Sequence, residues 1–413
     1  MSEISPDGSK LIFAAILGDG FSHGIVLDSS KNIYIGGGTN GGPSSTPGAS
    51  LGSGSFAAKL STDGAHLIYE TQLPGYPSVI SQLYSVNVIE GDHFLVWDST
   101  MQQVPTTVDS SHPCTTEGTM ASYMLELNSS GSDRVYGTYL PNVIAVTAAG
   151  VWSVSQDPTK LLDWMPLHGF GRQGMTCVSS AATFYSGPIA AGEFVAIFGI
   201  DIGPDQPAFL QLDQNGKVGT SLGDVGVFFN GVAAPLSYVS KNQINAVVPF
   251  EIASWPSSYV TILKGGVVLP ELNIPVTPTS LGFFRIGNEY AVVNQNGTLN
   301  GQFAPAPKQS IITIYGTGAG VMQPPVATGS LGDGTSSIAE HLTAIFSILD
   351  GFNSTDTTLS LLYAGDAPTL VQGVVVLQVS IPDTALPGPA SLRFLSGDDP
   401  ASIRSTGLRI WVK

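Results

Sequence analysis

Gly36, Gly38 and Gly41 have the G-x-G-x-x-G spacing of a dinucleotide-binding turn and follow a predicted strand. In such a turn the glycines let the backbone approach a pyrophosphate, and a helix must follow at once so that its N-terminus holds the phosphates. The next residues, GPSSTPGAS (42–50), cannot form that helix. We therefore interpret the three glycines as a glycine-rich loop and expect no cofactor there.

Patterns for a nucleophile and for a metal ion are equally incomplete. The G-x-S-x-G spacing around Ser50 and Ser221 suits a nucleophile elbow, which needs a strand, a sharp turn and a helix. Neither serine has a helical pattern beside it, so we interpret both as loop serines. None of the six histidines pairs with another at the i, i+4 spacing of a zinc motif, and His112 with Cys114 lacks a second ligand pair nearby. We expect no catalytic residue and no metal site, with a weak Ca²⁺ site in the acidic loop 201–205 as the alternative.

Two amides interrupt an apolar run at LSYVSKNQINAVVPF (236–250). Tyr238 lies near the start of the run, Gln243 and Asn245 lie inside it, and Pro249 closes it. Amides in such a place indicate either a ligand site or a structural device, because a buried amide needs hydrogen-bond partners. Whether the pattern recurs elsewhere in the chain decides between the two.

A related stretch in the second part of the chain contains Tyr363, Gln378 and Pro382. When the two stretches are aligned on their prolines, Val376 and Gln378 stand where the two amides stand in the first. One amide of the pair is absent, so a two-amide ligand site is not preserved. We therefore interpret the residues of both stretches as the structural signature of a repeated unit. The longer spacing from tyrosine to proline predicts a longer loop around Pro368.

Strand alternation assigns the amides of the first stretch to a face. Ile244, Ala246 and Val248 would point into a core, and Gln243 and Asn245 would point to the opposite face. There we expect both amides to bond the backbone of a neighbouring loop or of the adjoining half-domain. The substitution Asn245→Ala is then expected to lower the free energy of unfolding by about 1–3 kcal/mol.

The composition favours short strands over helices. Of 413 residues only 11% are charged, the mean hydropathy is +0.23, and there are 49 glycines and 28 prolines. Amphipathic helices need charged faces, whereas tight turns between strands use glycine and proline. The net charge of −16 is spread over the chain without a basic patch, which argues against nucleic acid as a partner. No apolar run is long enough to predict a membrane span.

Cys114 and Cys177 are the only cysteines, and both lie in loop-like stretches. They either form one disulfide, as suits an exported protein, or remain two separate thiols. The chain opens with SEISPDGSKL (2–11) after the first methionine, and this segment is not a signal peptide. The protein is therefore either cytoplasmic or a mature or trimmed piece of an exported protein.

The first part of the chain is built from a repeat. A polar, glycine-containing turn followed by an alternating strand occurs at 5–18, 61–75 and 128–141. Each copy is followed by a segment that reads as a β-hairpin, at 24–40, 86–100 and 145–157. Repeats of this size with four short strands are typical of propeller blades, in which each sheet packs between its neighbours.

The patterns LSTDGAHLIYETQLPG and GIVLDSSKNIYIGGGTN resemble the bacterial SBBP-type β-propeller repeats. The resemblance covers residues 1–160 and weakens in the third copy. It implies about three blades, whereas closed propellers have roughly four to eight, and the chain opens within a blade. We therefore expect either a fragment of a longer protein or blade edges that the later domains or another chain cover.

After Cys177 the pattern changes to two halves of about 110 residues, each the size of one immunoglobulin-like sandwich. Three motifs occur in order, namely APLSYVSKNQINAVVPFEI (234–252), VVNQNGTLNGQFAPAPKQSIITIYGTGAG (292–320) and LLYAGDAP (361–368). They resemble an uncharacterised C-terminal domain that recurs in Solibacter and other acidobacterial proteins and is related to Ig-like TIG folds. The resemblance spans residues 180–413, implies an exported or surface protein, and supplies no catalytic residue.

The predicted fold class is all-β, with partial β-propeller blades followed by two Ig-like β-sandwich units. We place the blades at 1–177 and the sandwich units at 178–283 and 284–413. The favoured function is that of a non-enzymatic, secreted or cell-surface protein in binding, adhesion or surface assembly, with a carbohydrate or another protein as partner. One alternative is a carbohydrate-active hydrolase or lyase with its site in the propeller part. The other is a self-assembling extracellular fibre or layer subunit that associates through exposed strand edges.

Overall fold

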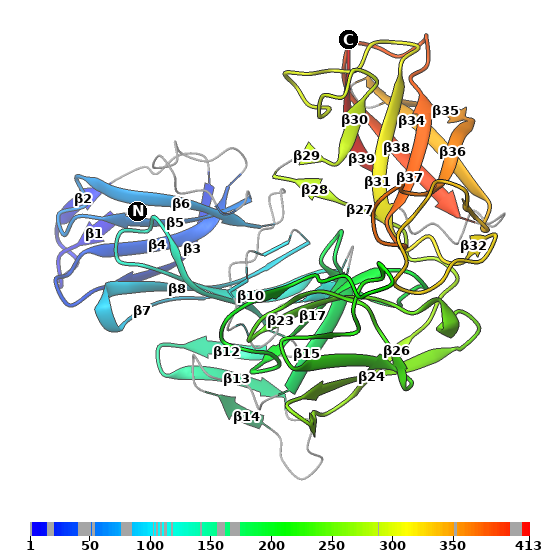
Figure 1. Cartoon of the computed structure of the whole chain (residues 1–413). Coiled ribbons are helices and arrows are strands. Elements are labelled where there is room, and N and C mark those ends of the chain that lie inside the picture. The colour runs from blue at the N-terminus through cyan, green and yellow to red at the C-terminus, as the bar shows by residue number, and fades with distance from the viewer. Residues whose placement is uncertain are drawn as a thin grey trace. The chain divides into compact units, whose positions relative to one another are not determined.

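The computed structural model shows an all-β chain, which confirms the coarse fold class (Figure 1). It describes residues 2–14, 20–39, 51, 54–75, 85–101, 103–104, 106–107, 110, 114–116, 119–140, 143–154, 162–165, 174–287, 289–350, 353–396 and 407–413. These residues contain no α-helix, and hence no helix that could span a membrane. The chain divides into two compact units, unit 1 at 1–172 and unit 2 at 173–413. The predicted boundary at 177 falls inside the first strand of unit 2, β15 (Gly174–Ser180).

Unit 1 consists of antiparallel sheets that follow one another along the chain. The first is a two-stranded hairpin of β1 (Ser2–Ile4) and β2 (Leu11–Ala14). Sheet 1 contains β3 (Gly20–Leu27), β4 (Ile33–Thr39), β5 (Gly54–Leu60) and β6 (Leu67–Pro74). Sheet 2 contains β7 (Ser85–Ile89), β8 (His93–Thr100), β10 (Ala121–Leu127) and β11 (Arg134–Tyr139). Sheet 3 contains β12 (Val143–Thr147), β13 (Gly150–Val154) and β14 (Leu162–Met165). Two short elements of unit 1 are the strand β9 (Thr115–Thr116) and the 3₁₀ turn η1 (Glu90–Asp92).

The repeat predicted from the sequence is present in the backbone of unit 1. The hairpins β1–β2, β5–β6 and β10–β11 share one register, including a shift at the last residue of the first strand. Each turn closes through the same two backbone hydrogen bonds and holds a glycine in the left-handed conformation, at Gly8, Gly64 and Gly131. The three segments predicted as further hairpins form β3–β4, β7–β8 and β12–β13.

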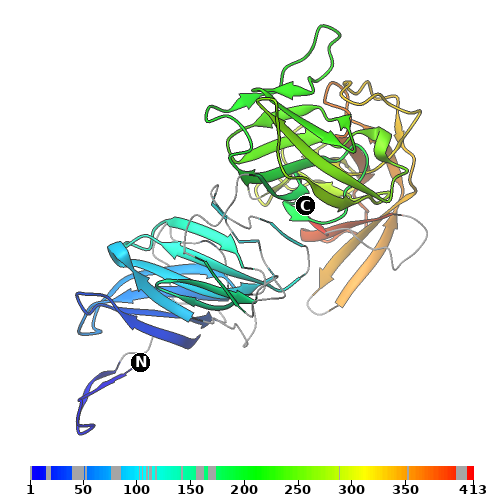
Figure 2. The same cartoon turned by 90° about the horizontal axis from the view of Figure 1, so that it is seen from below.

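Neighbouring layers of unit 1 meet through a contact that recurs with the repeat. The ring of Phe13 on β2 packs against Gly64 in the turn of sheet 1, and the ring of Tyr69 in sheet 1 packs against Gly131 in the turn of sheet 2. A Cβ atom at either glycine would overlap the ring, so the contact requires glycine. Separate apolar cores lie between these layers and between sheets 2 and 3. The hairpin β1–β2, in dark blue, projects at one end of the unit (Figure 2).

The first half of unit 2 packs two sheets face to face around one core. One sheet contains β18 (Ala208–Phe209), β22 (Leu236–Val239), β23 (Gln243–Val247), β17 (Phe194–Ile200), β15 and β16 (Tyr185–Ser186). The other contains β19 (Ser221–Leu222), β20 (Val225–Phe229), β21 (Val232–Ala233), β24 (Ser257–Lys264), β25 (Val267–Val268) and β26 (Leu272–Pro275). A 3₁₀ turn, η2 (Phe250–Ile252), follows β23.

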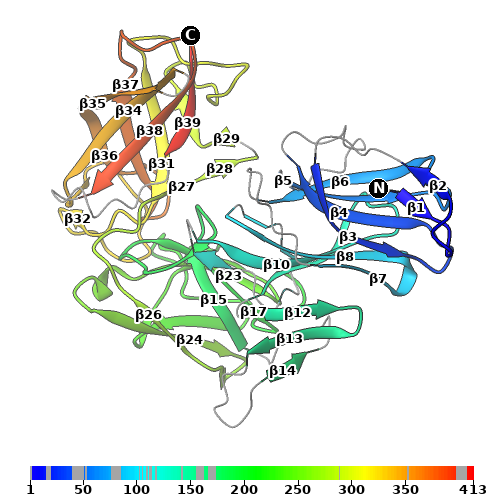
Figure 3. The ribbon, with the colours of Figure 1, turned by 180° about the vertical axis from the view of Figure 1, so that it is seen from behind.

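The second half of unit 2 repeats this arrangement around its own core (Figure 3). One sheet contains β27 (Gly282–Phe283), β30 (Val292–Asn294), β31 (Ile311–Thr317), β37 (Val375–Ser380), β36 (Leu361–Asp366), β33 (Ser337–Ile338) and β32 (Met322–Gln323). The facing sheet contains β35 (Asn353–Leu359), β34 (Leu342–Asp350), β38 (Gly388–Ser396) and β39 (Leu408–Val412). A small ribbon of β28 (Arg285–Ile286) and β29 (Glu289–Tyr290) lies apart from both sheets.

Candidate functional site

The amide pair of the first half lies on β23 with the predicted orientation but with different partners. Ile244, Ala246 and Val248 are buried in the core of the first half. Gln243 and Asn245 are half-buried on the opposite face, where Gln243 Nε2 donates to Asn245 Oδ1 at 2.8 Å. The predicted side-chain bonds to neighbouring backbone are therefore wrong. The two amides bond each other, because side chains two residues apart on a strand share a face.

Strand register confirms the predicted alignment of the two halves. Asn245 lies opposite Tyr238, and Gln378 lies opposite Tyr363 in the corresponding strand pair. Without a second amide on its strand, Gln378 Nε2 donates across the sheet to Thr313 Oγ1 at 3.1 Å. The same position is therefore polar in both halves and has a different hydrogen-bond partner in each.

The prolines that frame these strands lie at strand ends. Pro249 directly precedes η2, and Pro382 follows the buried Ile381 after the end of β37. The loop around Pro368, which joins β36 to β37, is longer than its counterpart between β22 and β23, as predicted. These prolines mark where the strands of the two cores stop.

The remaining sequence candidates do not assemble into a site. Gly36 and Gly38 lie within β4 and pair with strands on both sides, so the predicted glycine-rich loop is wrong for them. Ser221 is exposed on the short strand β19 and not in a loop. Cys114 and Cys177 are both disulfide-bonded. Three further candidates lie outside the described residues, namely Gly41, Ser50 and His112.

The acidic loop considered for Ca²⁺ has its carboxylates paired with lysines. Asp201 Oδ1 lies 2.8 Å from Lys264 Nζ, and Asp205 Oδ1 lies 2.8 Å from Lys241 Nζ. Lys264 Nζ also donates to the backbone oxygen of Asp201 at 3.0 Å. Ammonium groups therefore occupy the places where a cation would bind.

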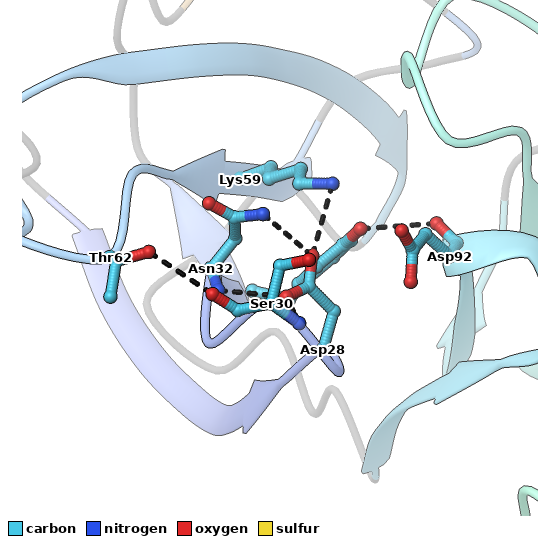
Figure 4. A network of polar contacts seen from close by, with 7 residues as sticks. Asp28, Ser30, Asn32, Lys59, Thr62 and Asp92 are labelled. Atoms are coloured by element: carbon cyan, nitrogen blue, oxygen red, sulfur yellow. Dashed lines mark hydrogen bonds and ion pairs between the residues drawn. The ribbon is translucent and has the colours of Figure 1, made fainter.

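A buried ion pair lies where sheets 1 and 2 meet, at the end with the short turns (Figure 4). Lys59 Nζ lies 3.2 Å from Asp28 Oδ2 and 4.6 Å from the centroid of the Tyr34 ring. Tyr34 Oη donates to the backbone oxygen of Asp92 in sheet 2 at 3.1 Å. Although burial opposes ionisation, the hydrogen bonds from Asn32 and Lys59 hold the pKa of Asp28 below its ordinary value. The network therefore connects strands β4 and β5 of sheet 1 to the turn η1 of sheet 2.

Sheet 2 has a counterpart of this pair, in which a carboxyl group takes the place of the lysine. Glu126 occupies the position of Lys59, since each precedes the last residue of its strand and lies opposite a tyrosine of the next strand. Glu126 Oε1 lies 2.6 Å from His93 Nδ1 on the neighbouring strand. Both charged groups have a partner within the stack of sheets. We therefore interpret them as residues that fix the layers, and not as a ligand site.

At the opposite end of sheets 1 and 2, a second polar contact joins the same two layers. Asp98 on β8 is fully buried and accepts hydrogen bonds from Ser55 Oγ of sheet 1 at 2.5 Å and from Ser99 N at 2.7 Å. Burial raises the pKa of Asp98 to about 6, against the opposing effect of these hydrogen bonds and of the His23 charge. Because the carboxyl group has no exposed surface, its role here is to hold strand ends together.

The end that Asp98 holds is the end from which the long connections of unit 1 leave. Residues 40–53 join β4 to β5 there, and residues 101–120 join β8 to β10. The opposite end has only tight turns such as 28–32. His23 lies on β3 at the end with the long connections, is exposed, and sits at a break in strand register. Such bulges redirect side chains and are common beside functional sites.

In unit 2, Glu193 is a buried acid that the sequence patterns do not reveal. Its Oε2 accepts a hydrogen bond from Ala190 N at 2.9 Å, and its remaining donors are the hydroxyl groups of Ser180 and Ser280. Burial raises the pKa of Glu193 to about 8, because these hydrogen bonds compensate only part of the lost hydration. The next residue, Phe194, donates its N–H to Thr317 Oγ1 of the second half at 2.8 Å. Glu193 thus lies at the junction of the two halves.

Asp366 is a buried acid of the second half, at the end of β36 and inside the sequence motif LLYAGDAP. Three backbone N–H groups of the loop 333–336 donate to its carboxylate at 2.9–3.1 Å. Gln372 Nε2 adds a bond at 3.1 Å, and Tyr363 Oη lies 3.3 Å from Asp366 Oδ1. The carboxylate therefore organises the loop that crosses the end of β36.

Sequence comparison adds no further information on function. The chain matches no family model, and no curated protein is significantly similar to it. The sequence signal for Asp98 is an acidic residue inside an apolar strand, in VWDST. That signal marks a buried carboxyl group without naming its partners.

Proposed function

We propose that the protein is a non-enzymatic, exported or cell-surface protein that binds a carbohydrate or another protein through the end of unit 1 that carries the long connections. In this proposal, the sheets of unit 1 are propeller-type blades and the two halves of unit 2 are Ig-like sandwiches. Unit 2 then acts as a stalk or attachment module. The proposal concerns a binding surface and assigns no reaction to the protein.

The observation that carries the proposal is the difference between the two ends of unit 1. All long connections between the strands of sheets 1 and 2 leave from one end, and the strands are joined by short turns at the other end. Loops on a rigid scaffold are where proteins place binding residues. Asp98 with Ser55, and Tyr123 Oη with Pro74 O, fasten the two sheets at that same end. The two sheets are therefore fastened to each other where the long connections begin.

Further support comes from the repeated hairpins and from the stacked layers. The hairpin packs on sheet 1, and sheet 1 on sheet 2, through the same aromatic-on-glycine contact, as expected for blades that share one geometry. The low charge and the two face-to-face sheet pairs of unit 2 suit an extracellular module.

Binding to isolated cell envelopes of the native organism and to a panel of polysaccharides tests the proposal. We expect the labelled protein to bind one of them, and we expect His23→Ala to weaken that binding about tenfold, the loss of one good polar contact. The matched control is His66→Ala, since His66 is also exposed on sheet 1 but lies in a short turn at the other end. Equal losses for both variants, or no binding to any surface, would contradict the proposed face.

Cell fractionation tests the proposed location. We expect the protein in the medium or on the cell surface of the native organism. Recovery in the cytoplasm would remove the basis for a surface role.

A further inference from the structure

The first layer of unit 1 exposes a position that the later layers bury. Ile4, Leu60 and Leu127 are equivalent, because each ends the first strand of its repeat hairpin in the same register. Leu60 is 2% exposed and Leu127 is fully buried, whereas Ile4 is 57% exposed. The difference arises because a preceding layer covers Leu60 and Leu127, and no described layer covers Ile4.

The turn glycines show the same difference. Gly64 and Gly131 each carry an aromatic ring from the preceding layer. Gly8 has the same turn, but no atom lies within 4 Å of the place where its Cβ would be. The first layer therefore presents an unoccupied copy of the surface that receives a preceding layer.

Sheet 1 also exposes apolar residues at strand β3, on the face that looks toward the first layer. Ile25 and Leu27 lie opposite Ile35 and Ile33, so they share a face with these two buried residues. Ile25 is 60% exposed and Leu27 54%, although their cross-strand partners are buried. All four residues face away from sheet 2, with Ile4 and Gly8 on the hairpin and Ile25 and Leu27 one layer further in on sheet 1. We call this stepped surface the open face.

Sheet 3, at the other end of the series, presents an apolar side chain on its outer side. Val146 and Val151 face sheet 2 and are buried against it. Trp152 follows Val151 on β13, so strand alternation points it away from sheet 2, and it is 39% exposed. An exposed tryptophan is a strong anchor for association because its apolar area is large.

We propose that unit 1 associates head to tail with a second copy of this chain, so that the outer side of sheet 3 of one copy covers the open face of the next. The contact would continue the layer-on-layer packing that already joins the hairpin, sheet 1, sheet 2 and sheet 3 within one chain. Because the two surfaces differ, the association is heterologous and builds rings or open rows. The inference goes beyond the proposed binding function, since it uses the ends of the stack and not the end that carries the long connections.

Sedimentation velocity of the full chain over about 1 to 100 μM tests the proposal. We expect the average mass to rise with concentration. We expect Ile4→Asp and Trp152→Asp each to raise the dissociation constant at least about tenfold, because a charge replaces a buried apolar contact. Leu362→Asp is the control, since Leu362 is 54% exposed on β36 of unit 2. Thermal unfolding of each variant checks that the fold is unchanged.

Mixing the two variants distinguishes a head-to-tail contact from a symmetric one. Ile4→Asp protein keeps an intact sheet 3, and Trp152→Asp protein keeps an intact open face. The mixture should therefore form heterodimers although each variant alone is monomeric. A wild-type monomer at all concentrations, unchanged association in both variants, or a mixture that stays monomeric would each overturn the proposal.

Discussion

The two halves of unit 2 each have one buried carboxyl group among their described residues, and the surroundings of these two groups differ. Asp366 receives three backbone N–H groups from one loop, a side-chain amide and a tyrosine hydroxyl. Glu193 receives one backbone N–H group and serine hydroxyls. A carboxylate in a dry site stays charged only when several donors replace its water. Whether a buried carboxyl group is ionised therefore depends on the hydrogen-bond donors around it, and not on burial alone.

Glu193→Gln tests the carboxyl group that has few hydrogen-bond donors. We expect this substitution to have the largest effect on the pH dependence of stability. Burial raises the pKa of Glu193 from 4.5 to about 8, so the folded chain holds more protons than the unfolded chain between these values. The resulting stability is complete below pH 4.5 and is lost as pH rises from there through about 8, by up to about 5 kcal/mol. Glutamine has the shape of the protonated acid, so the variant should lose this pH dependence. Urea unfolding over this pH range measures the effect.

Glu271→Gln is the control for that experiment, since Glu271 is exposed. Its pH profile should follow that of the wild type. If the profile of Glu193→Gln also follows the wild type, the folded chain does not hold Glu193 protonated.

Asp366→Asn tests the carboxyl group that has several hydrogen-bond donors. The amide keeps the size of the side chain, but its NH₂ group faces backbone N–H donors that need an acceptor. We expect a loss of about 3 kcal/mol in the free energy of unfolding at neutral pH. Denaturant unfolding measures it, with Asp383→Asn, an exposed acid of the same half, as control. A loss no larger than that of the control would show that the loop does not depend on the carboxylate.

The equivalent amide positions give the smallest effects. Asn245→Ala removes one bond to a half-buried partner, so we now expect a loss of about 0.5–1 kcal/mol instead of the 1–3 kcal/mol expected from the sequence. A double-mutant cycle with Gln243→Ala should show a coupling energy of similar size. Gln378→Ala should cost about as much through its bond to Thr313 Oγ1. A loss well above these values at Asn245 would indicate a partner beyond Gln243.

Features that depend on local sequence could be predicted. The three repeat hairpins follow from turn residues at fixed offsets, and the alignment of Gln378 with Asn245 follows from the prolines that end both strands. The glycines at 36 and 38 misled the sequence analysis, because glycine is common in loops but is tolerated in a strand paired on both sides.

Features that depend on distant partners could not be predicted. Lys59 lies on β5 and Asp28 in the turn after β3, and Ser55 of sheet 1 meets Asp98 of sheet 2. Their pairing follows from how the layers stack, and a single sequence does not contain that geometry. The same holds for Glu193, whose partner Ser280 is far away in the chain.

The contact between an aromatic ring and a turn glycine, which joins layers of unit 1, limits where the sequence can gain or lose residues during evolution. One inserted residue in the turn of Gly64 or Gly131 would displace the glycine from the ring of the layer before it. At the other end, the connections 40–53 and 101–120 already differ in length. Insertions and deletions should therefore accumulate at one end of the stack, while the other end changes only by gain or loss of a whole repeat.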